Sequence, residues 1–259
     1  MPDERGAFLA SAEWSEIVRR IRARTPARLL VGRAGAAYRT DTQLELREAH
    51  AAARDAVRAE LDLVTTFGAA FVKQWGLFEV CTQAAFKDVF LLQPDLGRHF
   101  NDASRTELQR CCSSGNDLQI AIGDGLSVPA VAAQVPPLLP LLHAGAQARG
   151  WTIGRTFVIR HCRVGILNEI GDLLGPKAAV LLIGERPGLA TSESLSAYMA
   201  YRPRQTQTDA DRNLISNIHA RGTNPADAAV RILNLAAQMM QLGASGYSLR
   251  EGPATLIGE

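Results

Sequence analysis

The segment LLIGERPGLATSESLS, residues 181–196, places a carboxylate and a guanidinium directly after a run of apolar residues. The carboxylate belongs to Glu185 and the guanidinium to Arg186, with Gly184 before them and Gly188 after them. If the apolar run is a buried strand, it delivers both charged groups to the edge of a sheet where ligands bind. A carboxylate accepts hydrogen bonds and a guanidinium donates them, so this edge can hold a polar ligand.

Two other segments end in the same way. DLQIAI is followed by Gly123-Asp124-Gly125 and then by Ser127, and TFVIRHCRV ends in the polar stretch 160–164, which contains Arg163. Ligands of open α/β sheets bind outside the carboxyl ends of the strands, so the three strand ends together predict one ligand site. Asp124, Ser127 and Arg163 are secondary candidates on this edge. Loops of any α/β domain are rich in Gly and Asp, so a purely structural role for these turns stays open.

The elements that position these residues are strands alternating with helices, which is typical of a parallel α/β sheet. Short apolar runs predict strands at 117–122, 156–164, 178–184 and 196–203. Helices are expected in the stretch that has Pro129 in its first turn, at 166–174 with Gly175 closing it, and at 225–242 between Pro225 and Gly243.

The first part of the chain has a different texture. Apolar residues with helical spacing predict a helix at 7–24, strong helix formers predict another at 42–63, and a third is expected at 103–112. The stretch between the first two is expected to be a loop punctuated by glycine. We therefore predict an N-terminal helical extension at 1–113 and an α/β domain at 114–259.

Composition excludes several classes of protein. The net charge is only +2 and no block of Lys and Arg stands out, which argues against a nucleic-acid-binding surface. No apolar run approaches the roughly 18 residues that a membrane span needs. The start of the chain, MPDERGAFLA, has no apolar core of a secretory signal. Four cysteines without C-x-x-C spacing favour a reducing, cytoplasmic location.

Common catalytic and cofactor motifs are missing from the sequence. Gly123 and Gly125 begin a dinucleotide fingerprint, but Val128 stands where that motif needs Gly or Ala for close packing. No Walker A, H-E-x-x-H or G-x-S-x-G motif is present, and the five histidines lack the spacing of metal ligands. A small oxidoreductase with a degenerate dinucleotide site is therefore disfavoured.

One near-match concerns a corrinoid motif. Residues 217–222, NIHARG, have the spacing of D-x-H-x-x-G, in which a histidine replaces the lower axial base of cobalamin. Asn217 stands where an aspartate should orient the histidine and raise its basicity. The segment also lies near the end of the chain, whereas the motif follows the first strand of its domain. A packing or capping role for His219 is favoured over axial ligation.

Taken together, six segments resemble the small (light) subunit of ethanolamine ammonia-lyase. They occur in the same order as in that family, and the resemblance spans nearly the whole chain from about residue 14; GERPGL with SESLS and the DR-x-x-ISNIH segment are the most specific. The six segments are GRAGAAYRT, LLQPDLGR, GDGLS, HCRVGILNEIGDLLG, GERPGLATSESLSAYMAY and DADRNLISNIHARGTNPADAA.

The resemblance implies an adenosylcobalamin-dependent lyase that converts ethanolamine to acetaldehyde and ammonia by a radical mechanism. It implies a Rossmann-like sheet of the cobalamin-binding type, and a large subunit that carries the substrate site and the catalytic residues. The chain alone is then inactive and has no catalytic residue of its own. The family binds cobalamin with its own base on cobalt, which again makes His219 structural. Members are cytoplasmic and are associated with bacterial microcompartments.

The resemblance assigns three residues of this chain to the cofactor. Val164 can offer backbone groups and an apolar side chain, and Glu185 can accept hydrogen bonds from the amides or hydroxyls of the corrinoid. Leu214 occupies the third position, where some members have cysteine; with leucine, only backbone or van der Waals contact is expected. An ordinary core role for Val164 and Leu214, and a solvent ion pair for Glu185 with Arg186, stay open.

The alternative function is a stand-alone α/β protein that binds a corrinoid or a nucleotide without catalysis. Dependence on a large subunit separates this alternative from a subunit of the lyase. The Ala-rich N-terminal helices fit a surface that packs on another subunit, although helical extensions often only cap a sheet.

Overall fold

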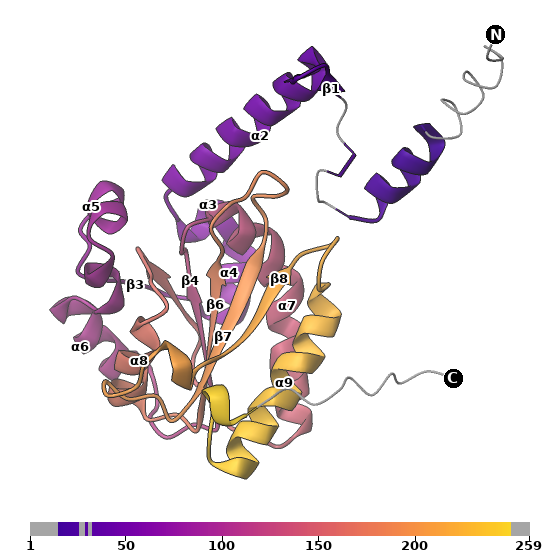
Figure 1. Cartoon of the computed structure of the whole chain (residues 1–259). Helices are drawn as coiled ribbons and strands as arrows, with labels where there is room; N and C mark the ends of the chain where they lie inside the picture. Colours follow the sequence, from indigo (N-terminus) through magenta and orange to yellow (C-terminus); the bar gives the residue numbers. More distant parts are fainter. Residues whose placement is uncertain (1–14, 26–28, 31–32, 250–259) are drawn as a thin grey trace, which may run out of the picture.

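The computed structural model describes residues 15–25, 29–30 and 33–249, and a six-stranded sheet forms its centre (Figure 1). The strand order is β3-β5-β4-β6-β7-β8. The first four strands in this order run parallel, whereas β7 and β8 are antiparallel to their neighbours. The strands are β3 (Glu79–Cys81), β4 (Leu118–Gly123), β5 (Phe157–Arg160), β6 (Ala178–Gly184), β7 (Leu195–Tyr201) and β8 (Asn213–Ile218).

The α/β class is confirmed and the sheet is mostly parallel, but the prediction of a parallel sheet does not hold for its last two strands. All four predicted strands form, and β7, the last of them, is antiparallel to β6. The reason is the connection between the two strands: residues 185–194 contain no helix. A parallel neighbour requires a crossover of a dozen or more residues, whereas a short loop returns the chain in the opposite direction. The short link at 202–212 reverses it again, into β8, which the sequence did not predict as a strand.

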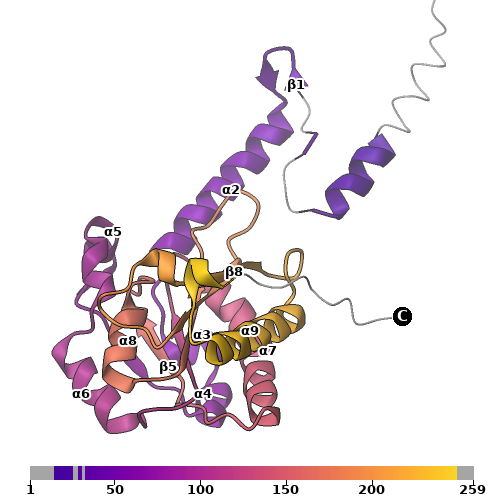
Figure 2. The same ribbon diagram turned by 60° about the horizontal axis from the view of Figure 1, so that its bottom comes forward.

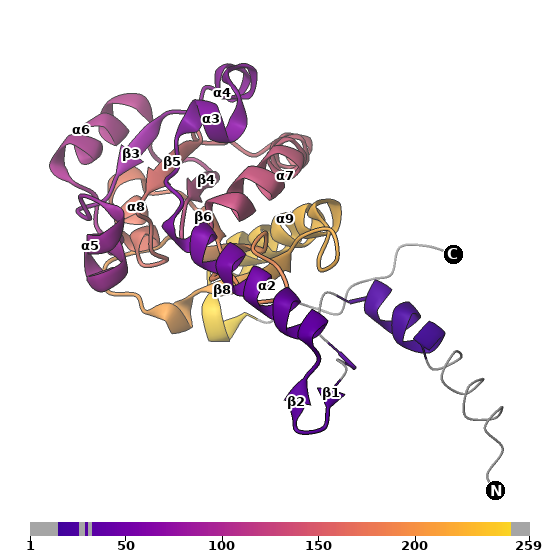
Figure 3. The same cartoon turned by 90° about the horizontal axis from the view of Figure 1, so that it is seen from above.

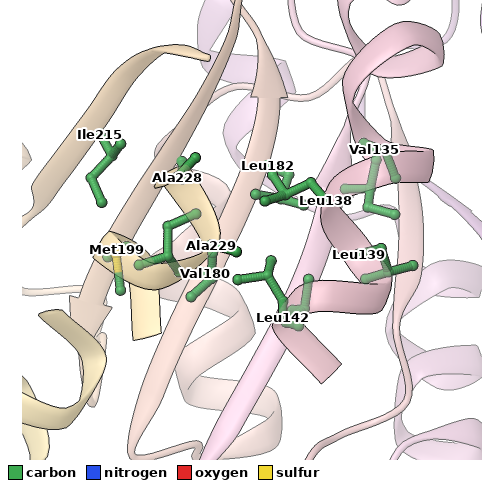
Figure 4. Packing of buried hydrophobic residues seen from close by; sticks show 14 of the residues in the cluster. Val135, Leu138, Leu139, Leu142, Val180, Leu182, Met199, Ile215, Ala228 and Ala229 are labelled. Carbon is green, nitrogen blue, oxygen red and sulfur yellow. The ribbon is translucent and has the colours of Figure 1, made fainter. Parts of the chain in front are cut away.

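Helices cover both faces of the sheet (Figure 2). The two central strands, β4 and β6, are buried along their whole length, as expected for parallel strands with helices on each side. Figure 4 shows the larger core, in which Leu138 and Leu142 of one helix pack against Val180 and Leu182 of β6. One face carries α7 (Val128–Ala148) and α9 (Pro225–Leu242), and the other carries α6 (Asp102–Cys111) and α8 (Ile166–Leu174).

The predicted helix ends in this part of the chain are confirmed. Pro129 lies in the first turn of α7, and α9 begins at Pro225. Both α8 and α9 end at a glycine in the left-handed conformation, Gly175 and Gly243, which releases the chain from the helix without a steric penalty.

The N-terminal part combines confirmed and corrected elements. Residues 15–23 of the helix predicted at 7–24 are helical, and residue 24 is in a turn. Residues 7–14 of this prediction lie outside the described part. The helix expected at 42–63 is α2 (Thr40–Arg58), and the chain then starts a separate helix, α3 (Leu63–Phe67). The break follows from Asp62, whose side chain accepts a hydrogen bond from the Thr65 amide and so caps the new helix.

The expected glycine-punctuated loop contains a small hairpin. Its two strands are β1 (Arg33–Ala34) and β2 (Ala37–Tyr38), and it precedes α2, which extends away from the sheet (Figures 1 and 3). The remaining elements are α4 (Ala69–Trp75), α5 (Lys87–Leu92) and the 3-10 helices η1 (Pro94–Arg98), η2 (Asp209–Asp211) and η3 (Gly246–Ser248).

Strand β3 comes from the segment assigned to the N-terminal extension and pairs in parallel with β5. The sheet thus takes an edge strand from residues before 114, and the division into 1–113 and 114–259 stays a prediction. None of the helices within residues 15–25, 29–30 and 33–249 is long and apolar enough to cross a membrane.

Candidate functional site

A pocket of about 360 Å³ opens at the carboxyl ends of β5 and β6 and continues over β7 and β8. We call it the carboxyl-edge pocket. The structure brings Val164, Glu185 and Leu214 together in its lining, although they come from three different segments. Arg163 and Arg186 line it as well. The structure thus brings residues from the predicted strand ends into one cavity, and the binding of a ligand there stays a prediction.

Each of the three residues is placed by a different local structure. Val164 lies in the turn after β5, where the Leu167 amide donates to its carbonyl and starts α8. Glu185 directly follows β6, and its amide donates to the Ser194 carbonyl, which closes the loop between β6 and β7. Leu214 lies in β8 opposite Tyr198 of β7, and both side chains line the pocket.

The Glu185 carboxylate is held by hydrogen bonds. Its Oε1 accepts from the Ser196 hydroxyl at 2.7 Å and from the Asn217 amide at 2.7 Å. These two donors belong to β7 and β8, so the carboxylate also joins the ends of the two antiparallel strands. Within the described residues Oε2 has no hydrogen-bond partner, and it remains available to accept from a bound molecule. The open alternative of an ion pair with Arg186 is not formed in this structure.

The pocket presents apolar surface beside this acceptor. Leu214 is 45% exposed, so its side chain is open to a ligand or a partner. Val164 is half-buried and packs against the smaller core, which contains Ile159 and Ile183. The lining therefore combines apolar contact with one fixed hydrogen-bond acceptor, the usual composition of a small-molecule site.

Tyr198 is a pocket residue that sequence reasoning missed. Burial raises the pKa of its phenol, and the nearby Glu185 raises it further, so the hydroxyl stays protonated and can donate a hydrogen bond at neutral pH. The alternation in SAYMAY was the available signal. Because Ala197 and Met199 point into the larger core, Tyr198 must lie on the opposite face of β7.

The secondary candidate Asp124 has a structural role in the described residues. It is fully buried, and its carboxylate accepts from the His161 amide at 2.9 Å and the Cys162 amide at 2.8 Å. The Lys87 ammonium lies 3.4 Å away and is also buried. These contacts fix the loop after β5, which carries Arg163 and Val164 into the pocket.

The other two secondary candidates differ from each other. Ser127 is the N-cap of α7 and accepts from the Ala130 amide, while its hydroxyl donates to the Ser192 carbonyl. Arg163 lines the pocket, and its guanidinium lies 4.2 Å from the centre of the Phe90 ring. Burial lowers the pKa of Arg163, and its Nε has no hydrogen-bond partner among the described residues.

The first glycines of the apparent dinucleotide fingerprint serve loop packing. Gly125 has φ +55°, and a Cβ there would lie 2.3 Å from the Gly184 carbonyl oxygen. The loops after β4 and β6 are thus in direct contact, which only glycine permits. Together with the mismatch at Val128, this close contact gives no support to a dinucleotide site.

His219 is held within its own loop. Its Nδ1 accepts from the Arg221 amide at 3.2 Å, so Nε2 carries the proton and donates to the Asn217 side-chain oxygen at 2.8 Å. Burial lowers the pKa of His219, which keeps the ring neutral at pH 7. With both nitrogens engaged, His219 orders the turn after β8, and no group of potential metal ligands is found within the described residues.

Comparisons with known proteins show the family of the chain. A family model described as "Ethanolamine ammonia-lyase light chain (EutC)" matches residues 15–250. The chain is 39% identical over 230 residues to proteins named "Ethanolamine ammonia-lyase small subunit" from Clostridium perfringens and from Clostridioides difficile strain 630. In both cases the alignment covers 89% of this chain and 76% of the relative. On the strength of these matches, the chain belongs to the ethanolamine ammonia-lyase light chain family.

Proposed function

We propose that this chain supplies one wall of the cobalamin site in an ethanolamine ammonia-lyase, with Val164, Glu185 and Leu214 in contact with the corrinoid. The family's enzyme is an adenosylcobalamin-dependent lyase, and its small subunit acts together with a large subunit. The observation that carries the proposal is the convergence of these three residues in the carboxyl-edge pocket.

The residues of the pocket fit a corrinoid in shape and chemistry. The edge of a corrin ring is apolar and carries peripheral amides, which match the exposed Leu214 side chain and the available Oε2 of Glu185. A pocket of about 360 Å³ is too small to enclose a whole corrinoid, so a second wall must come from elsewhere. We infer that the large subunit provides this second wall and the substrate site.

When bound, adenosylcobalamin supplies the radical that abstracts hydrogen from the substrate. The residues of this chain hold and shield the cofactor. Glu185 fixes the orientation of a peripheral amide, and the apolar groups of Val164 and Leu214 exclude water from one side of the ring. None of the three touches the substrate in this proposal, so ethanolamine is recognised and deaminated at residues of the large subunit.

The finer features of the fold belong to the same proposal. We infer that the sheet is a Rossmann-like sheet of the cobalamin-binding type carried by residues 114–259, preceded by a helical extension at 1–113. Helix α2 of that extension buries only Thr42 and Ala56 in this chain, and it exposes Leu44 to 59%. We propose that α2 packs on the large subunit, and that the complex is cytoplasmic, whether free or inside a bacterial microcompartment.

The proposal is tested by measuring acetaldehyde formation from ethanolamine and adenosylcobalamin in three samples: this chain, the cognate large subunit, and both mixed. We expect activity only in the mixture. Glu185→Gln is the sharpest variant, because the new amide keeps Oε1 for Ser196 and Asn217 but replaces the free acceptor with a donor. It should raise the cofactor concentration needed for half-maximal activity.

Two outcomes contradict the proposal. An inactive mixture of two folded chains would remove the lyase function from this pair, and corrinoid binding by this chain alone would then favour the stand-alone binding protein. An unchanged cofactor requirement in Glu185→Gln would remove Glu185 from the cofactor site while leaving the subunit assignment intact.

A further inference from the structure

A second cavity, also of about 360 Å³, adjoins the carboxyl-edge pocket at the start of α8. Val164 lines the first cavity and the next residue, Gly165, lines the second. We call the second one the arginine cavity, because Arg98 of η1 and Arg212, just before β8, both line it.

Arg98 has free hydrogen-bonding capacity in this cavity. Its alkyl chain packs over Gly165, where a Cβ would lie 2.9 Å from two of its carbons. Its Nη1 pairs with Asp95 at 3.1 Å, but Asp95 is 82% exposed, so this ion pair is weak. Within the described residues, Nε and Nη2 of Arg98 have no partner and can donate to a bound anion.

Arg212 supplies a second guanidinium, which is almost completely buried. Its side chain is 4% exposed; Nη1 pairs with Asp209 and Nη2 donates to the Asn168 side chain at 3.0 Å. Its Nε is buried without a hydrogen-bond partner in the described part of the chain. Burial lowers the pKa of Arg212, and the positive charge of Arg98 lowers it further.

Three positive charges thus surround the short segment Val164–Gly165. Arg98 also lowers the pKa of Arg163, which lies on the other side of the segment in the carboxyl-edge pocket. The acids beside this cluster are Asp95, which pairs with Arg98, Asp124, which lies near Arg163, and Asp209 and Asp211, which lie near Arg212. Arg163 and Arg212 therefore have acids close by, whereas the only counter-ion of Arg98 in the described residues is the exposed Asp95, so the free donors of Arg98 are open to an added anion.

The rest of the lining is polar, and its one acid is Asp209, which pairs with Arg212. Asn168, Gln207 and Thr208 supply amide and hydroxyl groups at the rim, in contrast to the apolar lining around Leu214. Guanidinium groups beside amides and hydroxyls suit a phosphate linked to a sugar, because each phosphate oxygen accepts charge-assisted hydrogen bonds.

We propose that the arginine cavity binds the phosphodiester in the nucleotide tail of the cobalamin whose ring lies in the carboxyl-edge pocket. In this proposal Arg98 donates hydrogen bonds to the phosphate, and the buried guanidinium of Arg212 offsets part of the negative charge of the phosphate. The side chains of Asn168, Gln207 and Thr208 face the sugar. This inference rests on the proposed cobalamin site. It adds a separate binding contribution, because the phosphate is a part of the cofactor distant from the corrin edge at Glu185.

The test measures the Kd of the reconstituted complex for two truncated corrinoids, cobinamide and cobinamide phosphate, from their visible spectra. We expect the native complex to bind cobinamide phosphate about 10- to 100-fold more tightly, the value of a charge-assisted hydrogen-bonded contact. Arg98→Gln should remove this preference without changing the Kd for cobinamide, and Arg98→Lys should keep part of it.

The matched control is Arg110→Gln, since Arg110 is an exposed arginine with the same i,i+3 ion pair, to Glu107, but on α6 outside either cavity. It should leave the preference intact. Glu185→Gln should weaken both corrinoids alike, which separates a failure of this inference from a failure of the cobalamin site. If neither corrinoid binds to the native complex, both proposals fall.

The inference is overturned if the native complex does not prefer cobinamide phosphate, or if Arg98→Gln keeps the full preference. In the second case the association of the two subunits is informative, because Arg98→Gln could keep the preference and yet weaken this association. The anion in the arginine cavity would then be a carboxylate of the large subunit.

Discussion

The carboxyl-edge pocket is held in place by many buried contacts within this chain, whereas helix α2 is held by few. The pocket rests on buried contacts: Asp124 is fully buried beneath it, and Glu185 joins the ends of two strands. Helix α2 has 19 residues, of which only Thr42 and Ala56 are buried in this chain. The pocket is therefore preorganised within the subunit, whereas α2 buries few of its residues and leaves Leu44 exposed, as the proposed contact with the large subunit requires.

Asp124→Ala is expected to cause the largest loss of stability, in the region with the most buried contacts. Removing the carboxylate leaves the buried Lys87 ammonium and the His161 and Cys162 amides without their partner. We expect a loss of about 3–5 kcal/mol in the free energy of unfolding. Urea unfolding at pH 7 measures it.

The matched control for Asp124→Ala is Asp88→Ala, which removes an exposed ion pair to Arg58 at the end of α2. We expect a change of less than about 1 kcal/mol there. Equal losses in the two variants would contradict the view that the two regions differ in internal support.

The second prediction concerns the pocket as a binding surface. Glu185→Gln should raise the Kd of the reconstituted complex for adenosylcobalamin by about tenfold, the effect of about 1.4 kcal/mol, while the chain unfolds at an unchanged urea concentration. Both strand contacts of Oε1 are kept in this variant. A change in stability of the same size as the change in affinity would mean that Glu185 acts only as a link between β7 and β8.

The third prediction uses pH at the opposite edge of the sheet, where no ligand is expected. Asp117 pairs with Lys177 at 2.7 Å and accepts two hydrogen bonds from Thr152. The ion pair and these hydrogen bonds lower the pKa of Asp117 to about 2. Because the folded pKa lies below the ordinary value of 3.8, the stabilisation is complete above about pH 4 and is lost as the pH falls through about 2.

Asp117→Asn should therefore cost about 1–2 kcal/mol at pH 7, reduced by exposure of the pair to solvent, and nothing near pH 2. Unfolding of both proteins across this range measures the difference, and corrinoid affinity should not change. A difference that grows as the pH falls would show that the sign of the linkage is wrong.

The smallest effect on the isolated chain is expected from Leu44→Ala in α2. Its side chain is 59% exposed, so the free energy of unfolding should change by less than about 0.5 kcal/mol. Association with the large subunit should weaken clearly, as measured by sedimentation or by titration of activity. Thr42→Ala, on the buried side of the same helix, should lower the free energy of unfolding more than Leu44→Ala does and should leave association with the large subunit unchanged.

The sequence predicted the buried parts of the fold well because their patterns are strong. Strands β4 and β6 are uninterrupted apolar runs, and Gly175 and Gly243 mark helix ends that allow few alternatives. The directions of β7 and β8 could not be read in this way, because direction depends on the connecting loops. Helix α7 contains Pro136, Pro137 and Pro140, residues that disfavour helix, and the burial of its Leu and Val side chains outweighs them.

The candidate site was predictable in its location and less so in its details. Parallel strand ends must meet at one edge, so Val164 and Glu185 were expected to be neighbours. Leu214 came only from the family resemblance, since β8 is mostly half-buried or exposed and gives a weak pattern. Tyr198 and Arg98 were missed because their role depends on which residues far along the chain lie beside them.

The most direct test of the central claim is an experimental structure of the complex of both subunits with bound cobalamin. The account predicts corrin atoms within about 4 Å of Val164, Glu185 and Leu214, with a peripheral amide donating to Oε2 of Glu185. A corrinoid bound entirely within the large subunit, with the carboxyl-edge pocket filled by solvent or by protein, would contradict it.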